Sequence, residues 1–340
     1  MRRLLIALAL LFAASPLLSG PALADDKPLN DVVADYEAYA LGQDPIQAGR
    51  EGDAKALARL PDVSPGADAL RRSFYEEFKQ RLDAIPAEGL TPQAKLNRAF
   101  LAWTLDRRIK RIGFDEARMP FNSDSGFDQD LSYYAGSTRI ETEADAQAWL
   151  SRLKLIPRYY AQSIENARRG VKTRFTQPRS TSESVLARAR AAAAAPVETD
   201  PLLQPFNSAK LPAARLAELK AEAVAIVRDK DRPAQRDFAT FLEKEYVPAS
   251  RKALGARTLP GGEAYYTWLV ADHTTTTLTP DQIHELGLSE VKRIRAQMET
   301  VKTEAGFTGD LAQFIAMLRT DPRFYAKTRE ELLELSLIHI

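Results

Sequence analysis

The chain has 340 residues, 45% hydrophobic and 27% charged, so disordered, collagen-like and fully membrane-embedded classes are poor fits. Basic and acidic residues nearly balance, 47 against 46, and nucleic acid is therefore not expected as a partner. The absence of cysteine excludes disulfides, thiolate nucleophiles and cysteine-ligated zinc, and only three histidines are available for any metal site.

The first 24 residues have the pattern of a cleavable secretory leader. Arg2 and Arg3 precede a short apolar run, and small residues stand before a cleavage position after Ala24. We therefore predict a signal peptide over residues 1–24 and a periplasmic or secreted protein. No membrane association is expected after cleavage, because no later stretch is long and apolar enough to span a bilayer. Without Arg2 and Arg3 the chain has 45 basic and 46 acidic residues, a net charge of −1.

Helical periodicity dominates from residue 25 onward, and alternation of apolar and polar residues is nearly absent. The sequence predicts a mostly helical, all-α domain over residues 25–334, with room for minor β-structure. Ser64-Pro65 and Thr91-Pro92 indicate two helix starts, because each pairs an N-cap with a first-turn proline. The two helices are expected to pair in antiparallel fashion and to bury their apolar stripes. These stripes consist of Leu70, Phe74, Phe78, Leu82 and Ile85, and of Leu96, Phe100, Leu101, Trp103, Leu105 and Ile109.

A longer helix is predicted from Glu143, with Gly170 as its terminator. Pro157 should kink it, because a proline inside a helix removes one backbone donor and crowds the preceding turn. Five prolines then interrupt residues 171–212, around one alanine-rich helix. Within this stretch, residues 196–212 are the candidate for an internal linker.

Residues 120–130 form a polar, non-helical segment flanked by aromatic side chains. Such loops often carry function. Its aspartates do not follow the spacing of a calcium loop, so a solvated or cleft-lining loop is favoured over a metal site. Asn122 and Asp124 are candidate substrate-binding residues, since their side chains can hydrogen-bond a peptide backbone.

His284-Glu285 resembles the start of the zincin motif, in which two histidines four residues apart on one helix hold zinc. Leu288 replaces the second histidine, so zinc ligation by His284 is rejected. Thr279 and Gln282 instead have the spacing of a capping box, which places His284 in the first turns of an ordinary helix. The predicted buried stripe of that helix consists of Ile283, Gly287, Val291, Ile294, Met298 and Val301.

His273 ends a predicted helix over residues 262–273 that also carries Tyr265 and Tyr266. A histidine at a helix C-terminus is commonly a favourable partner of the helix dipole, and this interpretation stays open beside a role in a substrate cleft. All three side chains are candidate substrate-binding residues, with capping or packing as the alternative for each.

The last six residues, 335–340, resemble the translation of a transposon-derived sequencing adapter. We therefore expect a non-native tail over residues 335–340, a truncated gene, and a helical domain that is incomplete at its C-terminus. An ordinary apolar helix end is the alternative.

Several motifs, taken in order, resemble the bacterial family called domain of unknown function 885. The strongest is the run TTTLTPDQIHELGLSEV at residues 275–291. The resemblance extends from about Tyr36 to Leu333. The other matching segments are residues 120–127, 241–246, 259–266 and 321–325.

The resemblance implies a mostly helical, zincin-type metallopeptidase fold, of which this chain is the N-terminal half. The family's zinc motif lies in the C-terminal half, so no catalytic residue, metal ligand or cofactor is assigned to this chain. Zinc and a peptide substrate are expected only in the intact parent. The expected function is therefore that of an exported, zinc-dependent peptidase, inactive as given. A non-catalytic periplasmic helical binding or scaffold protein is the alternative.

Overall fold

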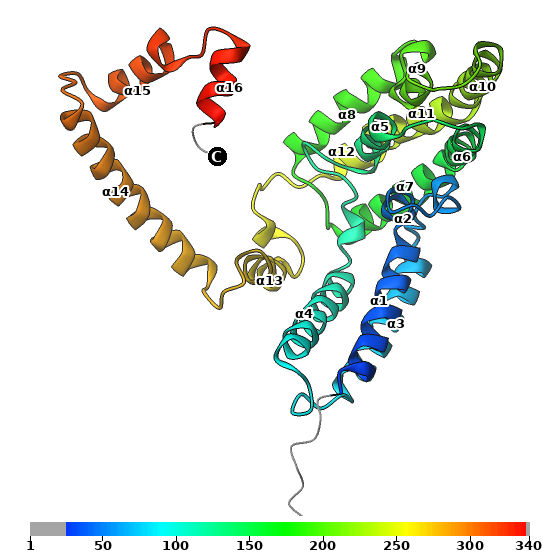
Figure 1. Cartoon of the computed structure of the whole chain (residues 1–340), viewed down its shortest axis with the longest axis horizontal. Coiled ribbons are helices and arrows are strands. Elements are labelled where there is room, and N and C mark those ends of the chain that lie inside the picture. Colours follow the sequence, from blue (N-terminus) through cyan, green and yellow to red (C-terminus); the bar gives the residue numbers. More distant parts are fainter. Residues whose placement is uncertain (1–24, 338–340) are drawn as a thin grey trace, which may run out of the picture. The chain divides into compact units, whose positions relative to one another are not determined.

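The computed structural model describes residues 25–337, so the predicted signal peptide and residues 338–340 of the predicted tail lie outside the described range. Within that range the fold is all-α, as predicted, and the β-structure consists of two isolated bridges. The chain divides into two units, residues 1–262 and 263–340, and each is described by itself (Figure 1). None of the helices within residues 25–337 combines the length and the apolar character that a membrane crossing requires.

The main helices of the first unit are α1 (Lys27–Gln43), α2 (Pro45–Arg50), α3 (Pro65–Asp83), α4 (Pro92–Phe114), α5 (Phe127–Ser137), α6 (Glu143–Leu153), α7 (Ile156–Thr173), α8 (Arg179–Ala194), α9 (Gln204–Asn207), α10 (Ala213–Ile226), α11 (Arg232–Phe241) and α12 (Val247–Ala249). Short helical turns connect them: η1 (Ala56–Ala58), η2 (Glu116–Arg118), η3 (Val197–Thr199), η4 (Pro201–Leu203), η5 (Val227–Asp231), η6 (Leu242–Tyr246) and η7 (Ala256–Thr258). The second unit contains α13 (Gly262–Thr274), α14 (Pro280–Glu304), α15 (Leu311–Thr320), η8 (Pro322–Phe324) and α16 (Arg329–Leu337).

Both predicted helix starts are confirmed, because the Ser64 and Thr91 side chains accept backbone N–H groups in the first turns of α3 and α4. The two helices pack side by side (Figure 1). Only part of each predicted stripe is buried, since one face of the pair packs in a cluster with α1. Phe78, Leu82, Leu101 and Leu105 are buried, whereas Leu70, Phe74, Leu96, Phe100 and Trp103 are exposed.

The predicted kink at Pro157 is wrong, because the chain forms two separate helices, α6 and α7. Pro157 lies in the first turn of α7, where its missing N–H has no helical partner to lose. Gly170 does not end α7, which continues for another three residues to Thr173. A Cβ atom on Gly170 would lie 2.5 Å from the Arg118 carbonyl oxygen and 2.8 Å from that of Phe175. The glycine therefore permits a close backbone approach inside the helix.

The proline-rich segment 196–212 is folded into η3, η4 and α9 within the first unit. Pro201 and Pro205 occupy first-turn positions of η4 and α9, so prolines start short helices here. Leu202, Leu203 and Phe206 from this segment are buried in the larger core. The boundary between the two units falls after Gly262 instead.

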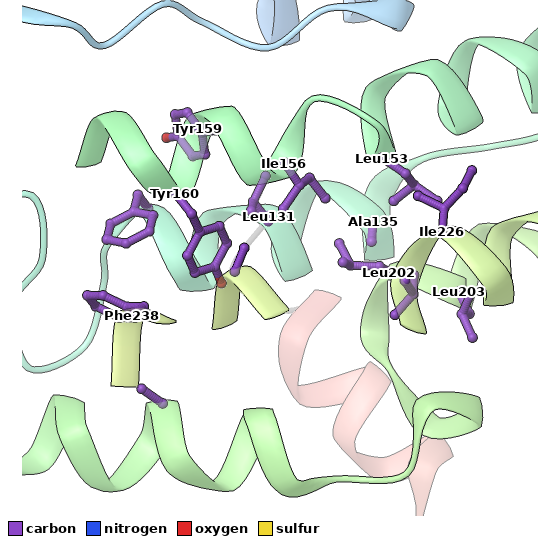
Figure 2. Packing of buried hydrophobic residues seen from close by; sticks show 14 of the residues in the cluster. Leu131, Ala135, Leu153, Ile156, Tyr159, Tyr160, Leu202, Leu203, Ile226 and Phe238 are labelled. Atoms are coloured by element: carbon purple, nitrogen blue, oxygen red, sulfur yellow. The ribbon is translucent and has the colours of Figure 1, made fainter. Parts of the chain in front are cut away.

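The larger core joins α5, α7, α8, α10 and α11. Figure 2 shows Leu131 from α5, Tyr160 from α7 and Phe238 from α11 in this cluster. Aromatic edges pack on aromatic faces here, with ring centroids of Phe127 and Phe238 4.8 Å apart. This packing fixes the helices that surround the cavity described below.

In the second unit the predicted capping box is confirmed. The Thr279 hydroxyl accepts the Gln282 N–H, and the Gln282 side chain accepts the Thr279 N–H at 2.8 Å. The predicted burial of the α14 stripe is wrong, since no residue of this helix is buried. Its main neighbour in the unit is the shorter α15, which cannot cover a 25-residue helix.

Candidate functional site

The five side chains predicted to bind substrate lie in different units. Asn122 and Asp124 lie in the loop that precedes α5, in the first unit. The Asn122 side-chain oxygen accepts the backbone N–H groups of Asp124 and Ser125, at 3.0 and 2.7 Å. Asn122 therefore stabilises a local turn, and a role of this loop in substrate binding stays a prediction.

Tyr265, Tyr266 and His273 lie together on α13, in the second unit. Tyr265 stacks on Trp268, with ring centroids 6.3 Å apart. The exposed imidazole of His273 lies 2.8 Å from the Leu269 carbonyl oxygen, in the last turn of the helix. These contacts are those of helix packing and capping, and substrate binding by these residues also stays a prediction.

A cavity of about 520 Å³ lies within the first unit, between α5, α7, α8, η4 and α11. This size is typical of small-molecule sites. The apolar side chains that line it include Leu131, Leu202 and Phe238. The polar side chains that line it are Asp128, Gln129, Ser132, Tyr160, Arg188, Thr199, Asp200, Arg232 and Gln235. None of the five predicted residues lines this cavity.

Arg232, the first residue of α11, connects three segments around the cavity. Its Nη2 atom lies 3.1 Å from the carboxylate of Asp200, and both side chains are only 3% exposed. The guanidinium also donates to the carbonyl oxygens of Ala192 and Pro196. The Ala192 carbonyl belongs to the last turn of α8, whose carbonyls lack helical partners, so Arg232 stabilises this helix end.

Two hydrogen-bond donors on the cavity wall have no acceptor among the described residues. They are the side-chain NH₂ of Gln235 and the hydroxyl of Tyr160, whereas Nε of Arg232 lacks a partner but is too buried to face the cavity. The Gln235 amide is oriented by Arg232, whose Nη1 lies 3.2 Å from the Gln235 oxygen, and this leaves the NH₂ group free. Burial raises the pKa of Tyr160 well above its ordinary value, so its hydroxyl keeps its proton. The cavity therefore offers donors to an acceptor on a ligand.

Arg188 from α8 links the edge of the cavity to the predicted loop. It forms an ion pair with Asp128 at 3.2 Å, and it donates to the backbone carbonyl of Ser123 at 3.2 Å. The loop that carries Asn122 and Asp124 is therefore attached to the cavity edge, although neither side chain enters the cavity.

Asp231, immediately before Arg232, is the last residue of the π-helical turn η5. It is fully buried, and neither carboxylate oxygen has a partner within the described part of the chain. Burial and the nearby charge of Asp200 raise the pKa of Asp231 to about 8, so the group is protonated at neutral pH. Asp231 does not line the cavity, although it directly precedes Arg232, which does.

Residues 25–337 contain no group of three or more histidine, cysteine, aspartate or glutamate side chains that could hold a metal ion. His273 and His284 are both exposed, on α13 and α14. The described residues therefore do not fit a zinc site.

Sequence reasoning missed the cavity because its polar residues come from segments far apart in the chain. The one available signal is local. Asp231 and Arg232 are two charged residues directly before Pro233. They stand at the start of a helix that carries an apolar stripe. Charged side chains are rarely buried without a partner, and this pair could have been singled out on that ground.

These features define an all-α protein with a cavity of ligand size that opens to solvent. Residues 45–337 match the family described as bacterial protein of unknown function (DUF885), and the chain belongs to this family. The chain is also similar to the crystal structure of a candidate lipoprotein from Colwellia psychrerythraea, with a TM-score of 0.80 and 20% identity over 94% of this chain. This similarity shows the fold, and the chain spans 58% of the length of that protein. Among curated proteins, the comparison found no match.

Proposed function

We propose that this chain is the N-terminal, ligand-binding portion of an exported peptidase and that its cavity binds peptide. The observation that carries the proposal is the combination of an apolar wall with two free donors, on Gln235 and Tyr160. A peptide matches this combination, because it presents apolar side chains beside carbonyl oxygens that accept hydrogen bonds. The sequence motifs that resemble the family's peptidases and the leader pattern support the peptidase and export parts of the proposal.

Zinc and a general base, in this proposal, come from residues outside the described range. Residues 25–337 lack a suitable group of ligands, and the solved C. psychrerythraea protein is longer than this chain. The chain by itself is then expected to bind peptides without cleaving them.

A peptide-binding and cleavage experiment tests the proposal. A defined mixture of short peptides is titrated onto residues 25–340 by calorimetry, then incubated with added zinc and examined by mass spectrometry. We expect binding without cleavage, and no stoichiometric zinc in the protein. The absence of binding for every peptide would contradict the proposed peptide site, whereas zinc-dependent cleavage would contradict the assignment of the metal ligands to other residues.

A non-catalytic periplasmic binding or scaffold protein is the second candidate. The cavity favours this second candidate, because binding a ligand there needs no metal. Reading the source genomic DNA past the codon for Glu334, without transposon adapters, separates the two. A frame that continues into a segment with a His-Glu zinc motif supports the peptidase, and a stop codon after Ile340 supports the binding protein.

A further inference from the structure

We infer that the cavity selects an uncharged apolar amide, such as an interior or capped segment of a peptide, over a free carboxylate. The inference rests on the proposed peptide binding and specifies which part of a peptide enters. It follows from the free donors, the balance of charge and the apolar wall.

The free donors define the polar half of the ligand. The NH₂ of Gln235 comes from α11, where Nη1 of Arg232, three residues earlier, donates to the Gln235 oxygen. The Tyr160 hydroxyl adds a second donor, from α7. Covering donors without an acceptor is unfavourable, so a ligand that supplies carbonyl oxygens gains from both.

The charges on the wall argue against a ligand carboxylate. Four charged side chains line the cavity, and they form two ion pairs, Arg232 with Asp200 and Arg188 with Asp128. A carboxylate would bring a third negative charge to a site with no unpaired cation among its lining residues. Removing that charge from water is costly without a counterion, whereas an amide carbonyl is neutral.

The apolar wall defines the other half of the ligand. Leu131, Leu202 and Phe238 line the cavity from three different elements, in the region shown in Figure 2. An aliphatic side chain beside the bound carbonyl would cover this surface and remove it from water.

Calorimetry with two matched peptides tests the selectivity. Acetyl-Leu-Leu-amide and acetyl-Leu-Leu with a free carboxylate differ only at the C-terminus. For residues 25–340 at pH 7, we expect the amide to bind at least about tenfold more tightly, because the acid buries an unpaired charge. Equal or tighter binding of the acid overturns the inference while leaving the proposed peptide binding intact. The absence of binding by either peptide overturns both.

Two substitutions locate the site. Tyr160→Phe keeps the ring that packs on Phe127 and removes the hydroxyl, and it should weaken binding of the amide about tenfold. Ala192→Trp fills the cavity and should abolish binding, whereas Ala191→Trp, on the same helix but outside the cavity, should not change it. Circular dichroism confirms that each variant is folded. Unchanged affinity in a folded Ala192→Trp variant would overturn the assignment to this cavity.

Discussion

Asp231 shows at the scale of one residue how burial sets a protonation state. Its pKa of about 8 lies well above that of an exposed aspartate, because the carboxyl group is buried and lies near the charge of Asp200. The folded state therefore binds a proton that the unfolded state releases at lower pH. As pH rises from about 4 to about 8, ionisation of this group becomes a growing cost to folding.

Replacing Asp231 by asparagine removes that cost. Asp231→Asn should raise the free energy of unfolding by at least about 1 kcal/mol at pH 8, and the gain should shrink toward pH 4. Urea unfolding at pH 4.5, 6 and 8 measures the difference. Asp229→Asn is the control, because that carboxylate is exposed and the pKa of Asp229 is lowered by its hydrogen bond to Arg228. A gain that does not depend on pH would contradict the protonated state of Asp231.

The ion pair of Arg232 with Asp200 should be sensitive to the loss of one partner. Asp200→Asn leaves a buried guanidinium without its counterion, and we expect a loss of about 3 kcal/mol in the free energy of unfolding. Glu222→Gln is the control, since it breaks the exposed pair with Lys154 and should change stability by less than about 1 kcal/mol. Chemical unfolding curves of both variants at pH 7 check this, and equal losses would show that burial of the first pair is unimportant.

At the scale of the helix, sequence patterns predicted the features that depend only on neighbouring residues, such as N-caps. The N-caps Ser64, Thr91 and Thr279 were predictable because each bond joins residues only three positions apart. Burial was predicted less well, since an apolar stripe does not specify whether a neighbour covers it. Phe100 and Val291, on α4 and α14, both belong to predicted stripes and are exposed. The cavity was not predictable, because it depends on where α5, α8 and α11 meet.

Gly170 offers a test of helix packing at this scale. Gly170→Ala places a methyl group against two backbone carbonyls, and we expect a loss of about 1–3 kcal/mol. Gly42→Ala is the matched control, because Gly42 lies in α1 with open space around it and should gain about 0.5–1 kcal/mol from helix propensity. Thermal unfolding monitored by circular dichroism compares them, and a stabilising Gly170→Ala change would contradict the close approach.

At the scale of the whole molecule, an incomplete domain is expected to expose apolar surface that its missing part would cover. Leu318, Leu332 and Leu333 are exposed, whereas Phe314 is buried and lies beside Phe307. The α14 stripe adds a larger apolar surface that its own unit leaves open. Exposed apolar surface of this extent favours association between molecules.

Residues 25–334 should therefore bind a hydrophobic dye and elute partly as soluble aggregates. A variant with Val291→Lys and Ile294→Lys should reduce both effects without lowering the melting temperature, because neither side chain is buried. Gel filtration with light scattering measures the change. A sharp, monomeric two-state transition of the unmodified chain without dye binding would contradict this expectation.

The central claim is that the cavity between α5, α8 and α11 binds peptide. Hydrogen exchange of residues 25–340, with and without saturating acetyl-Leu-Leu-amide, tests it most directly. The proposed site predicts slower exchange at residues 127–137, 179–194 and 232–241. Slower exchange confined to other segments, or no change at a concentration where calorimetry shows binding, would contradict it.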